Sequence, residues 1–430
     1  MDSVVAATLA FLCMIGTSRI LPAWLALLSL LASCSEPVQS TGALRQWAYV
    51  WQRDWTPVVS AAIRQAAPKL DGFVVLGAEI SWKDGKPNVL RPPVDWTVLR
   101  ESGKPIGIAM RVAPFADSTT VRDERMRFFS GTAKSLIEDA RQHGVTCAEF
   151  QVDYDCPKKR LAEYRAWLTP LRDAVKPIHL VITTLPSWLG ESEMGRLVAV
   201  ADGFVLQVHS VPTKNEGERV ALCDPERARR WVSQAGKLGR PFSVALPTYS
   251  ALVGYDAGGH SLGMATDGVQ PAWPPGTRVV EFDSDAEESA RLIAGWRAGH
   301  PAAMERIAWY RLPVEGKRNW RWPTFSAVLE GRAPAHRLEV FTGDENPADV
   351  SLANHGEAEE RLDVTVIVRW DGPAPVAAEA LRGWSVSQTE HEARFTRTAE
   401  TMPRLLPGGR REIGWLRFDA RPSLRAEIVR

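Results

Sequence analysis

The sequence predicts an α/β protein: a TIM-type (β/α)8 barrel followed by a small C-terminal antiparallel β-sandwich. Strand-like and helix-like segments alternate eight times between residues 45 and 331. Eight repeats in about 285 residues suit a closed barrel of this type. Beyond residue 331 the pattern changes to short runs of alternating apolar and polar residues. An open doubly wound sheet is the alternative, but no glycine-rich phosphate turn follows the first strand.

The expected barrel elements follow from apolar periodicity and from turn residues between segments. Strands are predicted at residues 46–51, 72–80, 105–112, 147–155, 179–185, 203–209, 242–246 and 306–312. Helices are predicted at residues 56–67, 96–102, 122–143, 159–175, 192–200, 225–238, 286–299 and 324–329.

Several helix ends carry recognisable capping residues. Asp224 precedes a proline at the first helical position, and Ser284 with Glu287 three residues later forms a capping box. Gly144 and Gly239 stand where helices should end, because glycine readily adopts the left-handed conformation found there.

Two regions depart from the repeat. Residues 248–282 are rich in glycine and proline, lack periodicity and follow the seventh strand, which predicts either a lid or a simple surface loop. In a lid, Tyr249, Tyr255 and Trp273 would line a subsite. Downstream, strands are predicted at 337–342, 349–354 and 362–370, and the proline- and alanine-rich segment 373–380 is predicted as a loop.

Composition narrows the function classes. A hydrophobic content of 45% and a charged content of 24% are ordinary for a globular protein. A net charge of +1 and the lack of a basic run argue against a nucleic-acid partner, and we expect a monomer. The 17 tryptophans are numerous. Most should be core, but flat indole rings also form stacking platforms in sugar-binding clefts.

The first 34 residues have the pattern of an export signal. Arg19 precedes an apolar run over residues 20–31, and the sequence Leu-Ala-Ser-Cys at 31–34 resembles a bacterial lipobox. The apolar run is too short for a membrane span. We therefore predict a lipoprotein signal peptide at 1–34, lipidation of Cys34 and a tether at 35–44. An ordinary signal peptide or a membrane anchor is the alternative.

The same pattern places the protein on the periplasmic face of a membrane. Ser35, rather than Asp, after the cysteine indicates the outer membrane of a two-membrane host. The remaining chain divides into a barrel at 45–331 and a sandwich at 332–430.

Export also changes how the cysteines are interpreted. An oxidising compartment permits one bridge among Cys147, Cys156 and Cys223. Cys156 and Cys223 both follow predicted strands and would lie on the same barrel face. We predict a disulfide between these two.

The fourth predicted strand carries the most informative pattern. Alternate side chains of a strand share a face, so Glu149, Gln151, Asp153 and Asp155 would point together, away from Phe150 and its apolar neighbours. The proline at 157 and the following helix turn the chain back over the strand. The acids would then meet at the mouth of an enclosed space, where carboxylates need a functional or structural reason.

Barrel enzymes place their working groups at the carboxyl ends of the strands. Those ends carry Arg53, Asp54, Glu79, Arg111, Asp153, Asp155, Ser187, Trp188, Gln207, His209, Tyr249, Tyr310 and Arg311. Glycoside hydrolysis needs one protonated and one ionised carboxyl group, and closely spaced acids separate their pKa values in this way. We predict Asp155 as proton donor, with Asp153 or Glu79 as its ionised partner.

The substrate-binding candidates are the other polar and aromatic side chains at this end of the barrel. They are Trp51, Arg111, Gln151, Trp188, Gln207, His209, Tyr249 and Tyr310.

The strand-four motif resembles that of the family-18 chitinases, which end this strand with acids at alternate positions followed by an aromatic residue and a proline. The resemblance places Asp155 at the proton-donor position. The chain departs from the motif in two ways: Gln151 replaces the first acid, and the donor is the shorter aspartate. The mechanism in which the substrate's own acetamido group participates is therefore not implied.

A closer resemblance extends through most of the barrel. The strings Gln-Val-Asp-Tyr-Asp-Cys-Pro (151–157), Leu-Pro-Ser-Trp-Leu (185–189), Asp-Gly-Phe-Val-Leu-Gln-Val-His-Ser (202–210) and Ala-Leu-Pro-Thr-Tyr (245–249) carry it. They are similar to a bacterial family known as domain of unknown function 3142, grouped with glycosidase-like barrels. The resemblance implies the fold and supplies no reaction.

The sequence suggests two candidate functions, and several of the residues involved could have purely structural roles instead. The first is a glycoside hydrolase-like lipoprotein acting on an envelope or extracellular polysaccharide, and the second is a non-catalytic glycan-binding lipoprotein. Asp153 and Glu149 could instead pair with arginines as structural ion networks, and His209 could be a hydrogen-bonded core residue. No metal-binding motif and no Gly-x-Ser-x-Gly elbow appears, so we predict no metal, no cofactor and no esterase.

Overall fold

The computed structural model describes residues 38–84, 86–115, 122–210, 220–266, 272–381, 383–398 and 404–430. The predicted signal peptide and the lipidation residue Cys34 lie outside the described residues. From the predicted tether, Gln39–Ser40 (β1) pairs antiparallel with His300–Pro301 (β14). In the part of the chain that is described, no helix is both long and apolar enough to cross a membrane.

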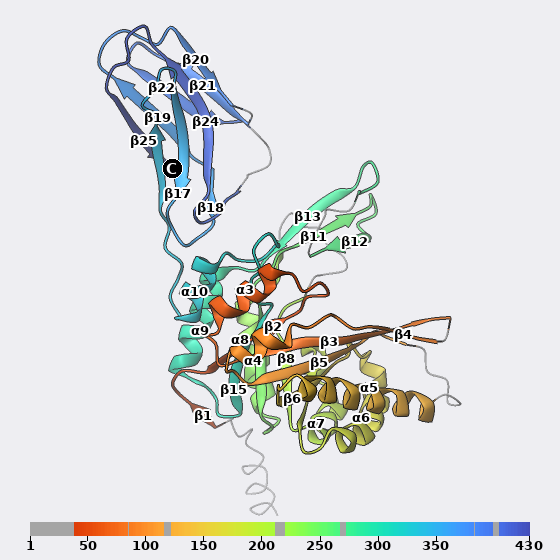
Figure 1. The fold of residues 1–430 in the computed structure, drawn as a ribbon. Coiled ribbons are helices and arrows are strands. Elements are labelled where there is room, and N and C mark those ends of the chain that lie inside the picture. The colour runs from red at the N-terminus through yellow and green to blue at the C-terminus, as the bar shows by residue number, and fades with distance from the viewer. Residues whose placement is uncertain are drawn as a thin grey trace, which may run out of the picture. The chain divides into compact units, whose positions relative to one another are not determined.

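Eight parallel strands close into a barrel, which confirms the predicted fold class. They are β2 (Arg45–Val50), β3 (Gly72–Lys83), β5 (Ile106–Val112), β6 (Cys147–Asp153), β7 (His179–Thr184), β8 (Gly203–Gln207), β10 (Phe242–Pro247) and β15 (Met304–Tyr310). Each strand pairs with the next in this order, and β15 and β3 both pair with β2 to close the ring. The strand that follows β3, β4 (Lys86–Leu90), pairs antiparallel with it and extends the hairpin beyond the barrel (Figure 1).

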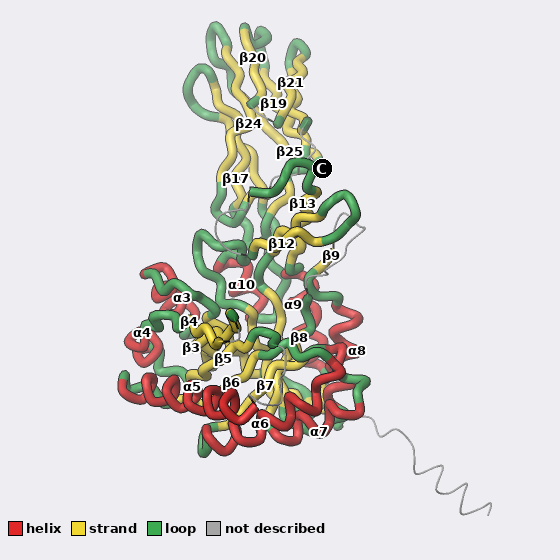
Figure 2. The backbone as a smooth tube through the Cα atoms, turned by 90° about the vertical axis from the view of Figure 1, so that its right-hand side faces the viewer, coloured by secondary structure: helices red, strands yellow, loops and turns green. Residues whose placement is uncertain are grey.

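The helices lie outside the ring of strands (Figures 1 and 2). They are α3 (Pro57–Ala66), α4 (Trp96–Glu101), α5 (Arg122–Gln142), α6 (Leu161–Val175), α7 (Ser192–Val200), α8 (Pro225–Gly236), α9 (Ala286–Ala298) and α10 (Trp322–Leu329). All eight predicted helices are present at the expected places.

The helix caps follow the predictions with one exception. The Asp224 side chain accepts a hydrogen bond from the backbone N–H of Arg227 at 2.9 Å, so the predicted N-cap of α8 is present. The predicted capping box of α9 is wrong by one residue. Asp285, not Ser284, caps this helix by accepting from the Glu288 N–H at 2.9 Å.

The interior of the barrel holds a chain of polar side chains rather than an all-apolar core. Tyr49 donates its hydroxyl proton to Gln151 Oε1 at 2.7 Å, and Gln151 Nε2 donates to Glu149 Oε1 at 2.6 Å. The second oxygen of Glu149 pairs with Arg306, whose Nε donates to Ser243 Oγ at 2.7 Å. Four strands (β2, β6, β10 and β15) are thus connected through one network that satisfies a buried charge.

The segment predicted as a lid or loop at 248–282 is instead largely a small sheet. The strands β11 (Ala251–Tyr255), β12 (Ser261–Ala265) and β13 (Arg278–Asp283) pair antiparallel, and β9 (Val220–Ala221) joins them in the order β12-β11-β13-β9. All five residues of β11 are buried, so the strand shows no alternation of apolar and polar residues. At Gly254 there is no room for a side chain, because the Trp273 ring packs there.

The C-terminal residues form two four-stranded antiparallel sheets around their own core, as predicted for a sandwich. One sheet has the order β16-β17-β24-β20 and the other β21-β22-β19-β25. Their strands are β16 (Leu338–Thr342), β17 (Ala348–Asn354), β19 (Thr365–Trp370), β20 (Ala377–Ala380), β21 (Trp384–Gln388), β22 (Glu392–Arg397), β24 (Arg410–Arg417) and β25 (Leu424–Val429), with a separate pair β18 (Glu360–Arg361) and β23 (Arg404–Leu405). The prediction of a loop over 373–380 is wrong for β20, which pairs with β24.

The buried pair of Arg306 and Glu149 gives a first prediction. Both side chains are at most 10% exposed, so Arg306→Met should strand the Glu149 charge in the barrel. We expect a loss of about 3–5 kcal/mol in the free energy of unfolding, measured by chemical denaturation. The double variant Glu149→Leu/Arg306→Met should recover most of the loss. Equal instability of the single and double variants would contradict this account.

Candidate active site

Three adjacent strands place charged side chains in register at the carboxyl end of the barrel. Glu79 on β3 lies opposite Arg111 on β5, and Arg111 lies opposite Asp153 on β6. Because the three strands are parallel neighbours, the two acids flank one arginine along the rim. The sequence prediction that strand ends converge is therefore confirmed for these three residues.

A cleft of about 400 Å³ opens beside this row. The three predicted catalytic acids, Asp153, Asp155 and Glu79, all line it. The rest of its wall is formed by Arg53, Ile80, Ser81, Asn88, Leu90, Arg111, Val112, Ala113 and Pro114. Ser81 and Asn88 come from β3 and β4, whose extended hairpin is seen in Figure 1. Through these residues the hairpin forms one side of the cleft.

Glu79 is held by two guanidinium groups. Arg53 contacts its Oε2 through Nη2 at 2.7 Å and Nε at 2.8 Å. Arg111 Nη1 lies 3.6 Å from Oε1. The Glu79 side chain is only 15% exposed, whereas that of Arg53 is 62% exposed. Two guanidinium groups thus hold this carboxylate in place at the cleft wall.

Asp153 and Asp155 have no ion pair at short range, and Asp153 is the more buried of the two. Its Oδ1 accepts hydrogen bonds from the Thr183 hydroxyl at 2.7 Å and from Gln207 Nε2 at 3.4 Å. Arg111 Nε is 3.9 Å from its Oδ2. Burial, and then the charge of Asp155, raise the pKa of Asp153 to about 6, although the Thr183 hydrogen bond and Arg111 oppose the shift.

Asp155 follows the strand rather than ending it, which corrects the predicted strand end by two residues. Strand β6 ends at Asp153, and Asp155 lies exposed on the next loop. Desolvation raises the pKa of Asp155, and the charge of Arg111 lowers it again in part. No described side chain is within ion-pairing distance of Asp155. It is therefore the acid best placed to meet a substrate.

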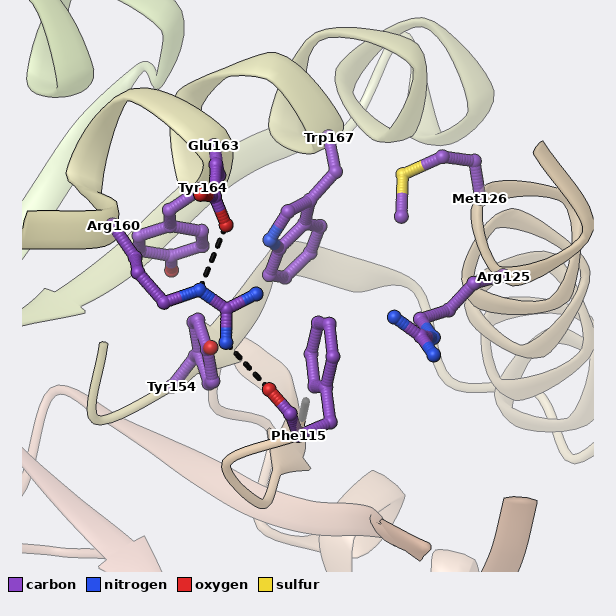
Figure 3. Close-up of a pocket in the computed structure, with 8 residues that line it drawn as sticks. All are labelled: Phe115, Arg125, Met126, Tyr154, Arg160, Glu163, Tyr164 and Trp167. Atoms are coloured by element: carbon purple, nitrogen blue, oxygen red, sulfur yellow. Dashed lines mark hydrogen bonds and ion pairs between the residues drawn. The ribbon is translucent and has the colours of Figure 1, made fainter. Parts of the chain in front are cut away.

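Tyr154, between the two aspartates, points away from the cleft. It packs against Phe115, Tyr164 and Trp167 in the layer between the barrel and helix α6 (Figure 3). Arg160 closes this cluster by donating to the Phe115 carbonyl oxygen at 2.5 Å. The space enclosed is about 10 Å³, which fits one water molecule and no larger ligand. The cluster anchors the loop that carries Asp155.

A group of aromatic side chains occupies the barrel axis at the same end. Tyr49, Trp51 and Tyr310 meet edge to face with ring centroids 5.5–5.6 Å apart. Tyr310 also stacks on His209 and meets Tyr249 edge on. Trp51, Tyr249, His209 and Tyr310 were predicted to bind substrate, and the structure gathers them into one cluster.

His209 is unsuited to act as a base near neutral pH. Burial lowers the pKa of its imidazole to about 4. Its Nδ1 lies 3.1 Å from the Ala245 carbonyl oxygen, so the neutral ring carries its proton there and donates it. Burial also raises the pKa of Tyr249 to about 12, which keeps that hydroxyl protonated.

Three predicted substrate-binding residues outside the aromatic cluster do not line the cleft. Gln151 is 1% exposed and belongs to the interior network below the rim. Trp188 is 1% exposed and packs edge on against Tyr164 on the helix side of the barrel, so it presents no face to a ligand. Gln207 contacts Asp153 rather than the cleft. Thr183 was not predicted as a site residue, although alternation along β7 places it on the inward face.

The predicted bridge between Cys156 and Cys223 is contradicted, because both thiols, like that of Cys147, are free and buried. The prediction placed both residues after barrel strands. Cys223 instead follows β9, which belongs to the small added sheet, whereas Cys156 follows barrel strand β6. Burial raises the pKa of both thiols to about 12, so neither is a ready nucleophile.

Metal ions require particular sets of donor side chains. Among the described residues, no cluster of three or more His, Cys, Asp or Glu side chains is arranged to hold an ion. Of the cleft acids, Glu79 is paired with Arg53 and Arg111, and Asp153 lies 3.9 Å from Arg111.

Two family models match the chain, one within the barrel and one within the C-terminal sheets. Residues 114–315 match the family model described as domain of unknown function DUF3142, which confirms the resemblance seen in the sequence strings. Residues 341–419 match the model described as domain of unknown function DUF8456. No curated protein matches the chain.

Several solved structures resemble the chain at low sequence identity. The spore cortex-lytic enzyme SleL of Bacillus cereus shares 11% identity, with 68% of this chain and 75% of that chain covered and a TM-score of 0.47. A chitinase from Chromobacterium violaceum shares 13% identity over 67% of this chain and 98% of its own, with a TM-score of 0.45. A glycoside hydrolase family 18 N-acetylglucosaminidase from Paenibacillus barengoltzii shares 10% identity over 67% and 99%, with a TM-score of 0.42.

The raised pKa of Asp153 predicts a pH-dependent cost in stability. An acid whose folded pKa exceeds its unfolded value stabilises the fold below the unfolded pKa, and this contribution is lost as the pH rises through the folded pKa. Asp153→Asn should therefore be more stable than the natural protein at pH 7.5, by about 1–3 kcal/mol, and nearly equal to it near pH 4. Chemical denaturation at the two pH values measures this difference.

The matched control is Glu79→Gln, which leaves Arg53 and Arg111 without their shared anion and should lower stability at pH 7.5. A lower stability of Asp153→Asn at pH 7.5 would show that its charge is not buried at a cost.

Proposed function

We propose that this chain, whose residues 114–315 match the family model described as domain of unknown function DUF3142, is a glycoside hydrolase. Its substrate would be an envelope or extracellular polysaccharide, cleaved by carboxylate acid–base catalysis. The observation that carries the proposal is the convergence of Glu79, Asp153 and Asp155 on one cleft of about 400 Å³.

The environments of these acids differ in the way that glycoside hydrolysis requires. Glu79 is ion-paired with Arg53 and Arg111. Burial and mutual repulsion raise the pKa of Asp153 and desolvation raises that of Asp155, so this pair holds a proton at mildly acidic pH. A protonated pair and an ionised acid lining one cleft are the two groups that cleave a glycosidic bond.

The chemistry follows from these states. Asp155, the exposed member of the pair, would donate the proton that it shares with Asp153 to the glycosidic oxygen as the bond to the anomeric carbon breaks. Glu79 would stabilise the positive charge that develops on that carbon, or bond to it. A water molecule would then add to the anomeric carbon and return one proton to the aspartates, which restores the starting state.

The pair sets the expected pH dependence. The two aspartates titrate as a unit, and the active form is the one that carries a single proton. Turnover should decline as the pH rises above about 6, where the pair loses that proton.

A non-catalytic glycan-binding role is the second candidate. The observation in its favour is Arg111, which lies 3.6 Å from Glu79 and 3.9 Å from Asp153 and so partly neutralises both acids. The hydrolase is preferred because Asp155 has no such partner among the described side chains, and because Glu79 lines the same cleft.

The role of Asp155 is tested by Asp155→Asn, which keeps the shape of the side chain and removes the transferable proton. We expect turnover of an unactivated glycoside to fall about 10²–10⁴-fold, with glycan binding nearly unchanged. Kinetics of reducing-end release and equilibrium binding measure the two quantities. Asp173→Asn, an exposed change on α6, is the control and should leave both unchanged. Full activity of Asp155→Asn would exclude this residue as the acid.

We also propose that the protein is exported and anchored through a lipid on Cys34, at the periplasmic face of the outer membrane. The lipobox-like sequence at 31–34 supports this. The variant Cys34→Ala should leave the membrane fraction or stall before processing, which fractionation and intact-mass analysis detect. Unchanged mass and unchanged membrane association would contradict anchoring at this residue.

A further inference from the structure

The carboxyl group of Asp153 is held asymmetrically. Its Oδ1 accepts two hydrogen bonds, from the Thr183 hydroxyl at 2.7 Å and from Gln207 Nε2 at 3.4 Å. Its Oδ2 has neither contact, and the nearest cation is Arg111 Nε at 3.9 Å. The two oxygens of this carboxyl are therefore not equivalent.

The two donors to Oδ1 determine whether this oxygen can carry a proton. An amide N–H donates only, so Gln207 opposes a proton on Oδ1. The Thr183 hydroxyl also lies within 3.5 Å of the Val152 carbonyl oxygen, but the shorter contact directs its hydrogen to Asp153. With Oδ1 occupied by donors, a proton bound by Asp153 must lie on Oδ2.

We propose that Thr183 is a positioning residue for Asp153, and that it fixes the side chain so that Oδ2 is the oxygen that binds and releases the proton. The hydroxyl acts through Asp153 and does not itself meet the substrate. This inference refines the role of the aspartate pair in the proposed hydrolase and rests on that proposal for its catalytic meaning.

Thr183 also opposes the protonation of Asp153. Hydrogen bonds donated to an ionised carboxylate stabilise that form and lower its affinity for protons. The charged and titratable groups facing Asp153 are Asp155 on its own segment, Glu79 and Arg111 on the neighbouring strands, Tyr49 and Tyr310 at the barrel axis, and Tyr164 on α6. None of these changes when the Thr183 hydroxyl is removed.

The strand supplies a matched control. Thr184, the next residue, is fully buried, and its hydroxyl donates to the Val205 carbonyl oxygen at 3.1 Å on the opposite face of β7. A change of Thr184 to valine removes a buried hydrogen bond of the same kind without touching Asp153. It separates positioning of the carboxyl from a general effect on the strand.

The test follows the titration of Asp153 in the full chain by NMR, with aspartate labelled by ¹³C at the side-chain carboxyl. The signal of Asp153 is identified by its absence in Asp153→Asn. Thr183→Val should move the midpoint upward by about one pH unit, a tenfold tighter binding of the proton. Thr183→Ser, which keeps the hydroxyl, should titrate like the natural protein, and so should Thr184→Val.

An unchanged midpoint in Thr183→Val would overturn the proposal, as would an equal shift in Thr184→Val. If Thr183→Val does not fold, Thr183→Ala removes the same hydroxyl with less crowding and gives the same readout. The titration needs no substrate, so it succeeds or fails independently of whether the protein hydrolyses a glycan.

Discussion

The neutralisation of Glu149 by Arg306 inside the barrel is the interaction on which the rest of the site depends. A closed ring of eight strands leaves no water around inward-facing polar groups, so each must find a partner within the ring. The pair joins β6 to β15, and Gln151 extends the connection to Tyr49 on β2. These contacts fix which face of β6 points inward. Asp153 follows Gln151 by two residues on the same face and lies at the mouth of the barrel.

At the rim, the acid on the same face of β6 is no longer neutralised by a cation in direct contact. The lower acid, Glu149, has its cation in direct contact, whereas Asp153 has Arg111 only at 3.9 Å. Burial is therefore balanced by charge pairing at the bottom of the barrel and by hydrogen bonds at the top. The result is one acid held for structure and one left able to bind a proton near pH 6. Sites that bind or transform ligands commonly keep such incompletely compensated groups.

The sequence predicted the barrel well because its elements are governed by local patterns. Each strand is an apolar run of five to twelve residues between turn signals, and helix starts such as Asp224 obey capping rules that involve neighbouring residues only. The placement of Glu79 and Asp153 in one cleft also followed, because parallel strands bring their carboxyl ends together.

The errors arose where distant contacts decide the outcome. Cys223 was assigned to the barrel face, but β9 pairs with β13, which is some sixty residues away in sequence. Trp188 was read as a cleft residue because it follows a strand, whereas packing on Tyr164 turns it outward. Thr183 carries no motif, and only the geometry of Asp153 reveals its contact.

The central claim is that the cleft beside Asp155 cleaves glycosidic bonds. It is tested most directly by incubating the purified protein with a panel of envelope and extracellular polysaccharides at pH 5.5 and pH 8, and by quantifying new reducing ends. The account predicts release from at least one polysaccharide, faster at pH 5.5 than at pH 8 because the aspartate pair must hold a proton. Tight binding of a glycan with no bond cleavage at either pH would contradict it.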